Sequence, residues 1–68
     1  MALTKNRLKD FREKKNITQE KLAVAAGVSR QTINSIEAGR YIPSLELALK
    51  LAKIFVLRVE DLFGVEEE

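Results

Sequence analysis

The sequence predicts an all-α fold, a compact bundle of five short helices, on the basis of three observations. Apolar residues recur every three or four positions along almost the whole chain, which is the spacing of one helix face. Serine or threonine stands where helices would begin, and glycine stands where two of them would end. The 68 residues include no cysteine and no histidine, so neither a disulfide nor a zinc site built from those ligands can hold the fold together. We therefore expect a single domain, residues 1–68, stabilised by helix packing.

The helix boundaries follow from these start and stop signals. The five helices are expected at about residues 5–15, 19–26, 30–38, 45–55 and 59–63. Thr18, Ser29 and Ser44 are the expected N-caps of the second, third and fourth helices, because a hydroxyl can accept a hydrogen bond from a free amide of the first turn. Gly27 and Gly39 end the second and third helices. Two short helices joined by a tight turn predict a helix-turn-helix over about residues 18–38.

The third helix carries the strongest functional signal. It has a polar side with a single charge, formed by Arg30, Gln31, Thr32, Asn34 and Ser35. An ordinary solvent-exposed helix favours pairs of glutamate and lysine. These shorter side chains suit the mixed donors and acceptors of base edges in the major groove of double-stranded DNA, where the second helix of a helix-turn-helix lies. Arg30 is suited to guanine, and Gln31 or Asn34 to adenine. The alternative is a polar surface helix without a partner.

The charge distribution is uneven along the chain. Residues 1–58 hold all 12 basic residues and five acidic ones, whereas residues 59–68 hold five acidic residues and no basic one. A basic body suits a polyanion such as DNA. The acidic tail is expected to point away from the DNA or to cover a basic edge of a partner subunit.

Four runs of sequence resemble the Cro and phage-repressor type of helix-turn-helix, also called XRE-type. They are TQEKLA from Thr18, GVSRQTI from Gly27, IEAGR from Ile36 and PSLELA from Pro43. The similarity extends through Glu60–Phe63, covers nearly the whole chain, and is greatest to short stand-alone members. The resemblance implies a lambda-repressor-like fold and a sequence-specific transcription regulator, a repressor that acts as a homodimer on a near-palindromic operator. Because the sequence has no apolar run long enough to span a bilayer and no signal peptide, we expect a cytoplasmic location.

The resemblance also implies roles for individual residues. The expected base contacts are Arg30, Gln31, Asn34 and Ser35. The expected phosphate contacts are Thr18, Gln19, Ser29, Thr32 and Arg40. Arg12 and Glu37 match a cation and an anion that tie the first helix to the end of the third. Gln19 and the Arg12–Glu37 pair could instead be unrelated surface residues.

Three residues depart from the family pattern. Val56 stands where the family often ends the fourth helix with glycine or asparagine, and a β-branched residue disfavours positive φ, so we expect another turn geometry there. Arg58 replaces the usual serine cap, which weakens the start of the fifth helix. Ala38 replaces a common asparagine and removes a possible phosphate contact.

The fourth helix carries more apolar residues than one core face needs. We assign one stripe to the core: Leu45, Ala48, Leu49, Ala52 and Phe55. We assign a second set to a dimer contact within about residues 45–66: Leu47, Leu51, Ile54, Val59 and Phe63. The alternative is that both sets pack inside one small domain. In some short members the termini pair, so we also expect a ribbon of Ala2–Thr4 with Gly64–Glu66, with Leu3 and Val65 facing the core.

Two other functional classes are alternatives to this prediction. One is a protein-interaction module of the same fold, such as an antitoxin or a coactivator. The other is an enzyme, which the lack of histidine, of cysteine and of an acidic cluster outside the tail argues against. We expect no cofactor, metal, small-molecule ligand or membrane partner. The operator and the regulated genes do not follow from the sequence.

Overall fold

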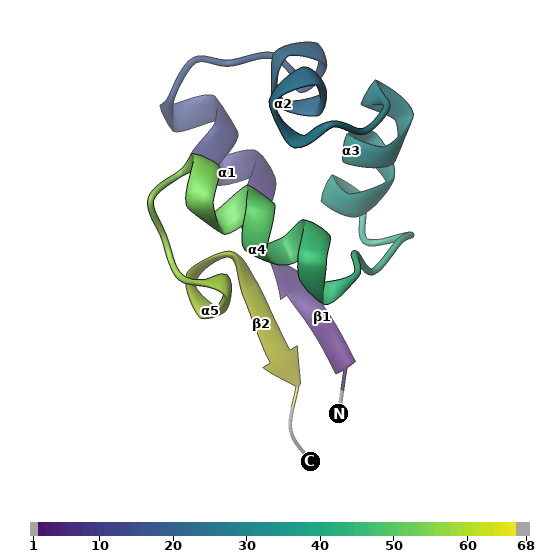
Figure 1. Ribbon diagram of the computed structural model, residues 1–68. Helices are drawn as coiled ribbons and strands as arrows, with labels where there is room; N and C mark the ends of the chain where they lie inside the picture. The colour runs from purple at the N-terminus through teal and green to yellow at the C-terminus, as the bar shows by residue number, and fades with distance from the viewer. Residues whose placement is uncertain (1, 67–68) are drawn as a thin grey trace.

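The fold is a bundle of five short helices closed at one end by a two-stranded ribbon (Figure 1). The computed structural model describes residues 2–66, and it describes side chains within residues 6–64. The elements are β1 (Ala2–Asn6), α1 (Leu8–Lys14), α2 (Gln19–Ala26), α3 (Arg30–Glu37), α4 (Leu45–Ile54), α5 (Val59–Leu62) and β2 (Phe63–Glu66). The predicted helical bundle and the predicted terminal ribbon are both confirmed.

The three predicted N-caps are all present. The hydroxyl of each cap residue, Thr18, Ser29 or Ser44, accepts a hydrogen bond from the backbone N–H three residues later, at 3.0 to 3.1 Å. Each bond satisfies one of the amides that a helix start leaves without an internal partner. The caps therefore explain why α2, α3 and α4 begin where the sequence predicted.

The four longer helices all end in the same way. Each is followed by one residue with positive φ, which is Asn16, Gly27, Gly39 or Val56. The next residue then donates its N–H to a carbonyl five positions back, at distances from 2.8 to 3.3 Å. This pattern of hydrogen bonds is the Schellman motif, which satisfies carbonyls at the helix end.

Val56 corrects the expectation that this turn avoids positive φ. Its φ is 57°, and the turn has the same geometry as the ones at glycine. The Val56 N–H donates to the Lys53 carbonyl at 3.1 Å, and the Leu57 N–H donates to the Ala52 carbonyl at 2.8 Å. These two bonds, and the packing of Leu57 on the core, offset the strain of a β-branched residue in the left-handed region.

The helices at the two ends of the chain are shorter than predicted. α1 begins at Leu8 rather than near residue 5, because Lys5 and Asn6 pair with β2. α5 ends at Leu62, because Phe63 belongs to β2. No hydroxyl caps α5, but the Asp61 carboxylate accepts a hydrogen bond from the Arg58 backbone N–H at 3.0 Å.

The ribbon is antiparallel and longer than predicted. Lys5 lies opposite Gly64 and Asn6 opposite Phe63, and the register is irregular between Ala2 and Lys5. The predicted orientation of the side chains of Leu3 and Val65 lies outside the described residues. The ribbon joins the two ends of the described chain at the pole of the molecule away from α2 and α3 (Figure 1).

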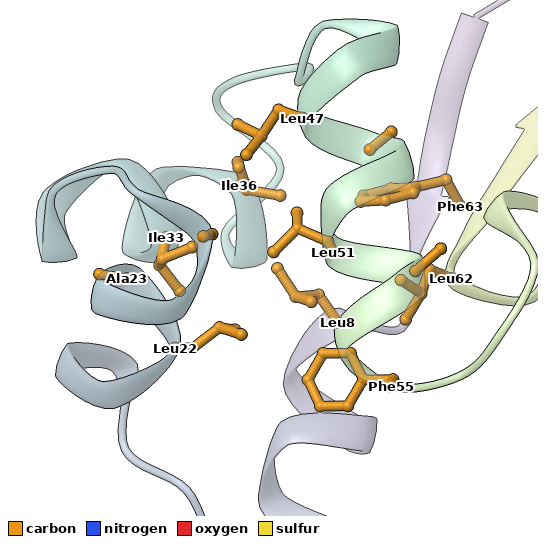
Figure 2. Close-up of a cluster of buried hydrophobic side chains, with 13 residues drawn as sticks. Leu8, Leu22, Ala23, Ile33, Ile36, Leu47, Leu51, Phe55, Leu62 and Phe63 are labelled. Atoms are coloured by element: carbon orange, nitrogen blue, oxygen red, sulfur yellow. The ribbon is translucent and has the colours of Figure 1, made fainter.

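α4 lies at the centre of the core (Figure 2). The six largest fully buried side chains come from every helix: Leu8, Leu22, Ile33, Ile36, Leu51 and Leu62. Figure 2 shows Leu47 and Leu51 beside Ile36 and Leu8, whereas Phe63 packs on α4 from the ribbon. α4 is thus covered by neighbouring elements over much of its circumference.

This packing corrects the assignment of the two apolar sets on α4. Leu47 is only 8% exposed, Leu51 is 0% exposed and Phe63 is 2% exposed, so these residues belong to the core of the domain and not to an outer face. Leu45 and Leu49, which were assigned to the core, are 71% and 54% exposed. The error has a physical cause: the sequence gives two apolar stripes on one helix, and only the positions of the other elements decide which stripe is covered.

Candidate nucleic-acid interface

α3 presents a polar face that the core holds firmly. Ile33 and Ile36 are fully buried, whereas Arg30 and Gln31 are exposed on the outer side. Thr32, Asn34 and Ser35 are half-buried. α2 packs against α3, and a turn after Gly27 joins them, so the two form a helix-turn-helix at one end of the molecule (Figure 1).

The loop after α3 extends this face. The Arg40 guanidinium donates from Nη2 to Oδ1 of Asn34 at 3.0 Å, so Arg40 lies against the helix. Tyr41 is 47% exposed. It lines a shallow hollow of 280 Å³ together with Ser29, Gln31, Thr32 and Ser35.

Sequence reasoning missed Tyr41. The available signal was that this residue is the only tyrosine of the chain and stands between Gly39 and Pro43, where helix cannot continue. An aromatic ring with a hydroxyl in the loop after a polar helix is suited to contact both bases and backbone. The structure places it beside four of the predicted contact residues.

The capping hydroxyls keep part of their hydrogen-bonding capacity. Ser29 Oγ lies 2.9 Å from Thr32 Oγ1, and both atoms are at the exposed start of α3. Thr18 occupies the equivalent place at the start of α2. A hydroxyl that accepts one hydrogen bond can still donate its own hydrogen, so Thr18 remains able to donate to a phosphate. The contact between Ser29 and Thr32 uses the hydrogen of one of these two hydroxyls and leaves the other for a phosphate.

A partly buried ion pair connects α1 to α3, and its arginine also reaches the loop before α2. Arg12 donates to the Glu37 carboxylate from Nε at 2.6 Å and from Nη2 at 3.2 Å, and from Nη1 to the Ile17 carbonyl at 2.8 Å. The side chains are 11% and 4% exposed. The hydrogen bond to Glu37 raises the pKa of Arg12 above its ordinary value, although burial acts in the opposite direction. The structure therefore contains the ion pair that the resemblance implied.

Gln19 belongs to the same network. Its Nε2 donates to Oε1 of Glu37 at 3.0 Å, which fixes the amide at the first position of α2. One amide hydrogen and the carbonyl oxygen are left for other partners. Glu37 thus orients the residue that the family pattern assigns to a phosphate.

The first two acidic residues of the C-terminal segment lie apart from this face. Glu60 and Asp61 are on α5, which Figure 1 shows away from α3. Among residues 2–66 no helix is long and apolar enough to cross a membrane, and no cluster of acidic side chains in the described part could hold a metal ion.

Comparison with known proteins agrees with this architecture. A sequence model of the helix-turn-helix family matches residues 8–62. A helix-turn-helix-type transcriptional regulator of Methanocaldococcus jannaschii is 55% identical over 64 residues, which cover 94% of this chain and 97% of that protein. YgzD of Bacillus subtilis, also described as a transcriptional regulator of this type, is 50% identical with the same coverage.

Two solved structures are also similar. The restriction-modification controller protein C.AhdI of Aeromonas hydrophila is 35% identical, with a TM-score of 0.78, over 84% of this chain and 86% of that chain. The clp gene regulator ClgR of Corynebacterium glutamicum is 33% identical, with a TM-score of 0.74, over 79% of this chain and 57% of that chain. The match spans most of the chain, both helices of the motif and the core that supports them. The chain therefore belongs to the XRE-type family of helix-turn-helix transcriptional regulators.

Proposed function

We propose that this protein is a repressor that binds a near-palindromic DNA operator as a homodimer and reads it with α3. The observation that carries the proposal is the outer face of α3, which is polar, has one charge, and is fixed from behind by two fully buried isoleucines. A helix of this kind fits the major groove and places short donors and acceptors against base edges. Occupation of an operator is sufficient to block a promoter, so repression needs no further chemistry.

The face divides into two groups of contacts. Base edges would be read by Arg30, Gln31, Asn34 and Ser35. Phosphates would be bound by Thr18, Gln19, Ser29, Thr32 and Arg40. This division is supported by position, because the capping residues and Gln19 lie at the starts of α2 and α3, where free backbone amides also favour an anion.

The dimer surface is proposed on the outer side of α4 and on α5. Leu45, Leu49 and Val56 share one side of α4 and its end, and they are 71%, 54% and 85% exposed. Leu49 and Val56 border a groove of 750 Å³ that continues along α5 to Val59. Val59 is half-buried and lines the groove, so it remains at the edge of this surface. Ile54 packs against the core and does not line the groove, and Leu47, Leu51 and Phe63 are buried.

A second copy of this chain is the occupant that the groove favours. Lys53 and Arg58 line it together with Glu60 and Asp61, so the surface carries both signs of charge. A two-fold axis through such a surface can set the basic side chains of one copy against the acidic side chains of the other. Because one recognition helix covers few base pairs, the second copy would also double the contacts and set the two helices about 34 Å apart.

Fluorescence anisotropy with labelled duplex DNA tests the proposal. A random duplex should bind, and its affinity should fall about a thousandfold between about 50 and about 200 mM salt if the dimer contacts six or more phosphates. Repeated selection from a randomised duplex pool should enrich a near-palindromic site. Binding that does not depend on salt, or no binding, would contradict the proposal and favour a protein partner of the antitoxin or coactivator kind.

A further inference from the structure

The hydrogen bond between Arg40 and Asn34 has a consequence for base recognition. Arg40 Nη2 lies 3.0 Å from Asn34 Oδ1, and both residues border the outer face of α3. A guanidinium can only donate, so the amide atom that faces it must be the oxygen. The contact therefore fixes the orientation of the Asn34 amide: Oδ1 is the amide atom bonded to Arg40, and the NH₂ group is left for another partner.

We propose that Asn34 and Arg40 act as one recognition unit that presents chiefly hydrogen-bond donors and selects guanine. An asparagine that reads adenine must accept from N6 with its carbonyl oxygen while it donates to N7. Here that oxygen already accepts from a cation, and a base amino group that approached its second lone pair would meet the guanidinium hydrogens and the positive charge of Arg40. The unit offers the two amide hydrogens of Asn34 and the remaining guanidinium hydrogens of Arg40.

Guanine is the base that fits such a surface. Its major-groove edge presents two acceptors, O6 and N7, whereas adenine presents one acceptor and one donor. A unit of this kind would set the adenine N6 donor against the donors and the positive charge of Arg40. Thymine offers one acceptor beside a methyl group, and cytosine offers a donor. The positive charge of Arg40 strengthens the preference for an edge with two acceptors.

This inference changes the role of two residues and rests on the proposed function. Asparagine is suited to adenine, but the Asn34 amide would here read a base edge with two acceptors. Arg40, which the family pattern places at the phosphate backbone, would become a specificity-determining residue through Asn34. Arg30 and Gln31, one turn earlier on α3, would read their own base pairs independently.

Selection of binding sites from a randomised duplex pool, run in parallel for several variants, tests the inference. Asn34→Ala locates the base pair, because it should relax the preference there alone, by a factor of about 5 to about 150. At that position the unmodified protein should select guanine. Arg40→Met, which keeps the stem but removes the donors, should switch the preference to adenine. Asn34→Asp should switch it toward cytosine, because a carboxylate only accepts.

The control is Lys9→Met, which removes the positive charge of one exposed side chain on α1. This variant should bind DNA slightly more weakly but select the same sequence. Each variant is compared with the unmodified protein by circular dichroism, so a loss of fold is seen separately. Three results overturn the inference: adenine at the Asn34 position in the unmodified protein, an unchanged site for Asn34→Ala, or a uniform loss of affinity for Arg40→Met. If no protein enriches any sequence, the proposed function itself fails.

Discussion

The side-chain amide of Asn6 donates a hydrogen bond to the main-chain carbonyl of Ile36, thirty residues further along the chain. The carbonyl oxygen of the same amide accepts from the Leu8 N–H at 3.2 Å. One side chain in β1 therefore provides a hydrogen-bond partner for a free amide at the start of α1 and for a carbonyl near the end of α3. Neither contact could be found from sequence spacing, because Asn6 reads as part of a helix until the ribbon is known.

Asn6→Ala should destabilise the domain by about 1 to 3 kcal/mol, because it leaves a partly buried carbonyl and an amide without partners. The measurement is urea unfolding followed by circular dichroism, with the midpoint and the slope both recorded. Asn6→Asp keeps an acceptor for Leu8 but removes the donor to Ile36, so it should lose as much or more. A shift below about 0.5 kcal/mol in both variants would mean that water replaces the two bonds.

The Arg12–Glu37 pair predicts a larger loss. Arg12→Met alone or Glu37→Gln alone should cost about 3 to 5 kcal/mol, because each leaves a buried group without its partner. The combined variant should lose less than the sum of the two single losses. The matched control is Arg58–Glu60, a pair separated by 3.4 Å with side chains 79% and 73% exposed, where Arg58→Ala should change stability by about 0 to 1 kcal/mol. Additive losses at Arg12 and Glu37 would show that the two residues act separately.

The left-handed Val56 predicts a stabilising substitution. Val56→Asn should raise stability by about 1 kcal/mol, because asparagine tolerates positive φ and the lost side chain is 85% exposed. Gly39→Ala is the converse control: a Cβ there meets nothing within 4 Å, so the φ of 78° alone should cost about 1 kcal/mol. Thermal unfolding at several protein concentrations checks both, since any effect on association depends on concentration and strain does not. A Val56→Asn variant of unchanged or lower stability would contradict the account of the turn.

Arg30 and Gln31 should separate specific from non-specific binding. Arg30→Ala and Gln31→Ala should each lose about 1 to 3 kcal/mol on the selected site and little on random duplex, because base contacts specify and phosphate contacts position. Gln19→Ala should weaken both duplexes alike. Equal losses on both duplexes for Arg30→Ala would assign that residue to the phosphates. Anisotropy titrations at one fixed salt concentration give all three comparisons.

Two neighbouring leucines on α4 test the dimer surface. Leu49→Glu should give a folded monomer with most operator affinity lost, because Leu49 is 54% exposed. Leu51→Glu should prevent folding, because Leu51 is fully buried. Sedimentation equilibrium at micromolar concentration reports the state of each. A single 7.7 kDa species for the unmodified protein, bound to its operator as one copy per site, would end the dimer proposal.

Local signals in the sequence determined most of the correct predictions. The boundaries of α2 and α3 follow from a hydroxyl cap at the start and a glycine at the end, and the start of α4 follows from its hydroxyl cap; these signals act within one turn of the helix. The polar face of α3 was predictable because its two apolar residues leave only one orientation. These features depend on neighbours in sequence and need no knowledge of the rest of the fold.

The errors lie where distant parts of the chain meet. Which apolar stripe of α4 is buried depends on the positions of α5 and β2. α1 begins later than predicted because Asn6 is part of β1, where it pairs with Phe63 of β2. The positive φ at Val56 depends on the docking of Leu57 on the core. Tyr41 lies beside the polar face of α3 only because the loop that follows α3 returns next to that helix.

The pairing of β1 with β2 also bears on how the protein is made. β1 comes first among the elements and its partner β2 comes last, so β1 is synthesised well before the strand that it pairs with. Until then β1 has an unpaired strand edge, and Asn6 has no fixed position from which to hold the end of α3. The support that Asn6 gives to α3 is therefore complete only after β2 has been made, so a chain interrupted before β2 should hold the polar face of α3 less firmly.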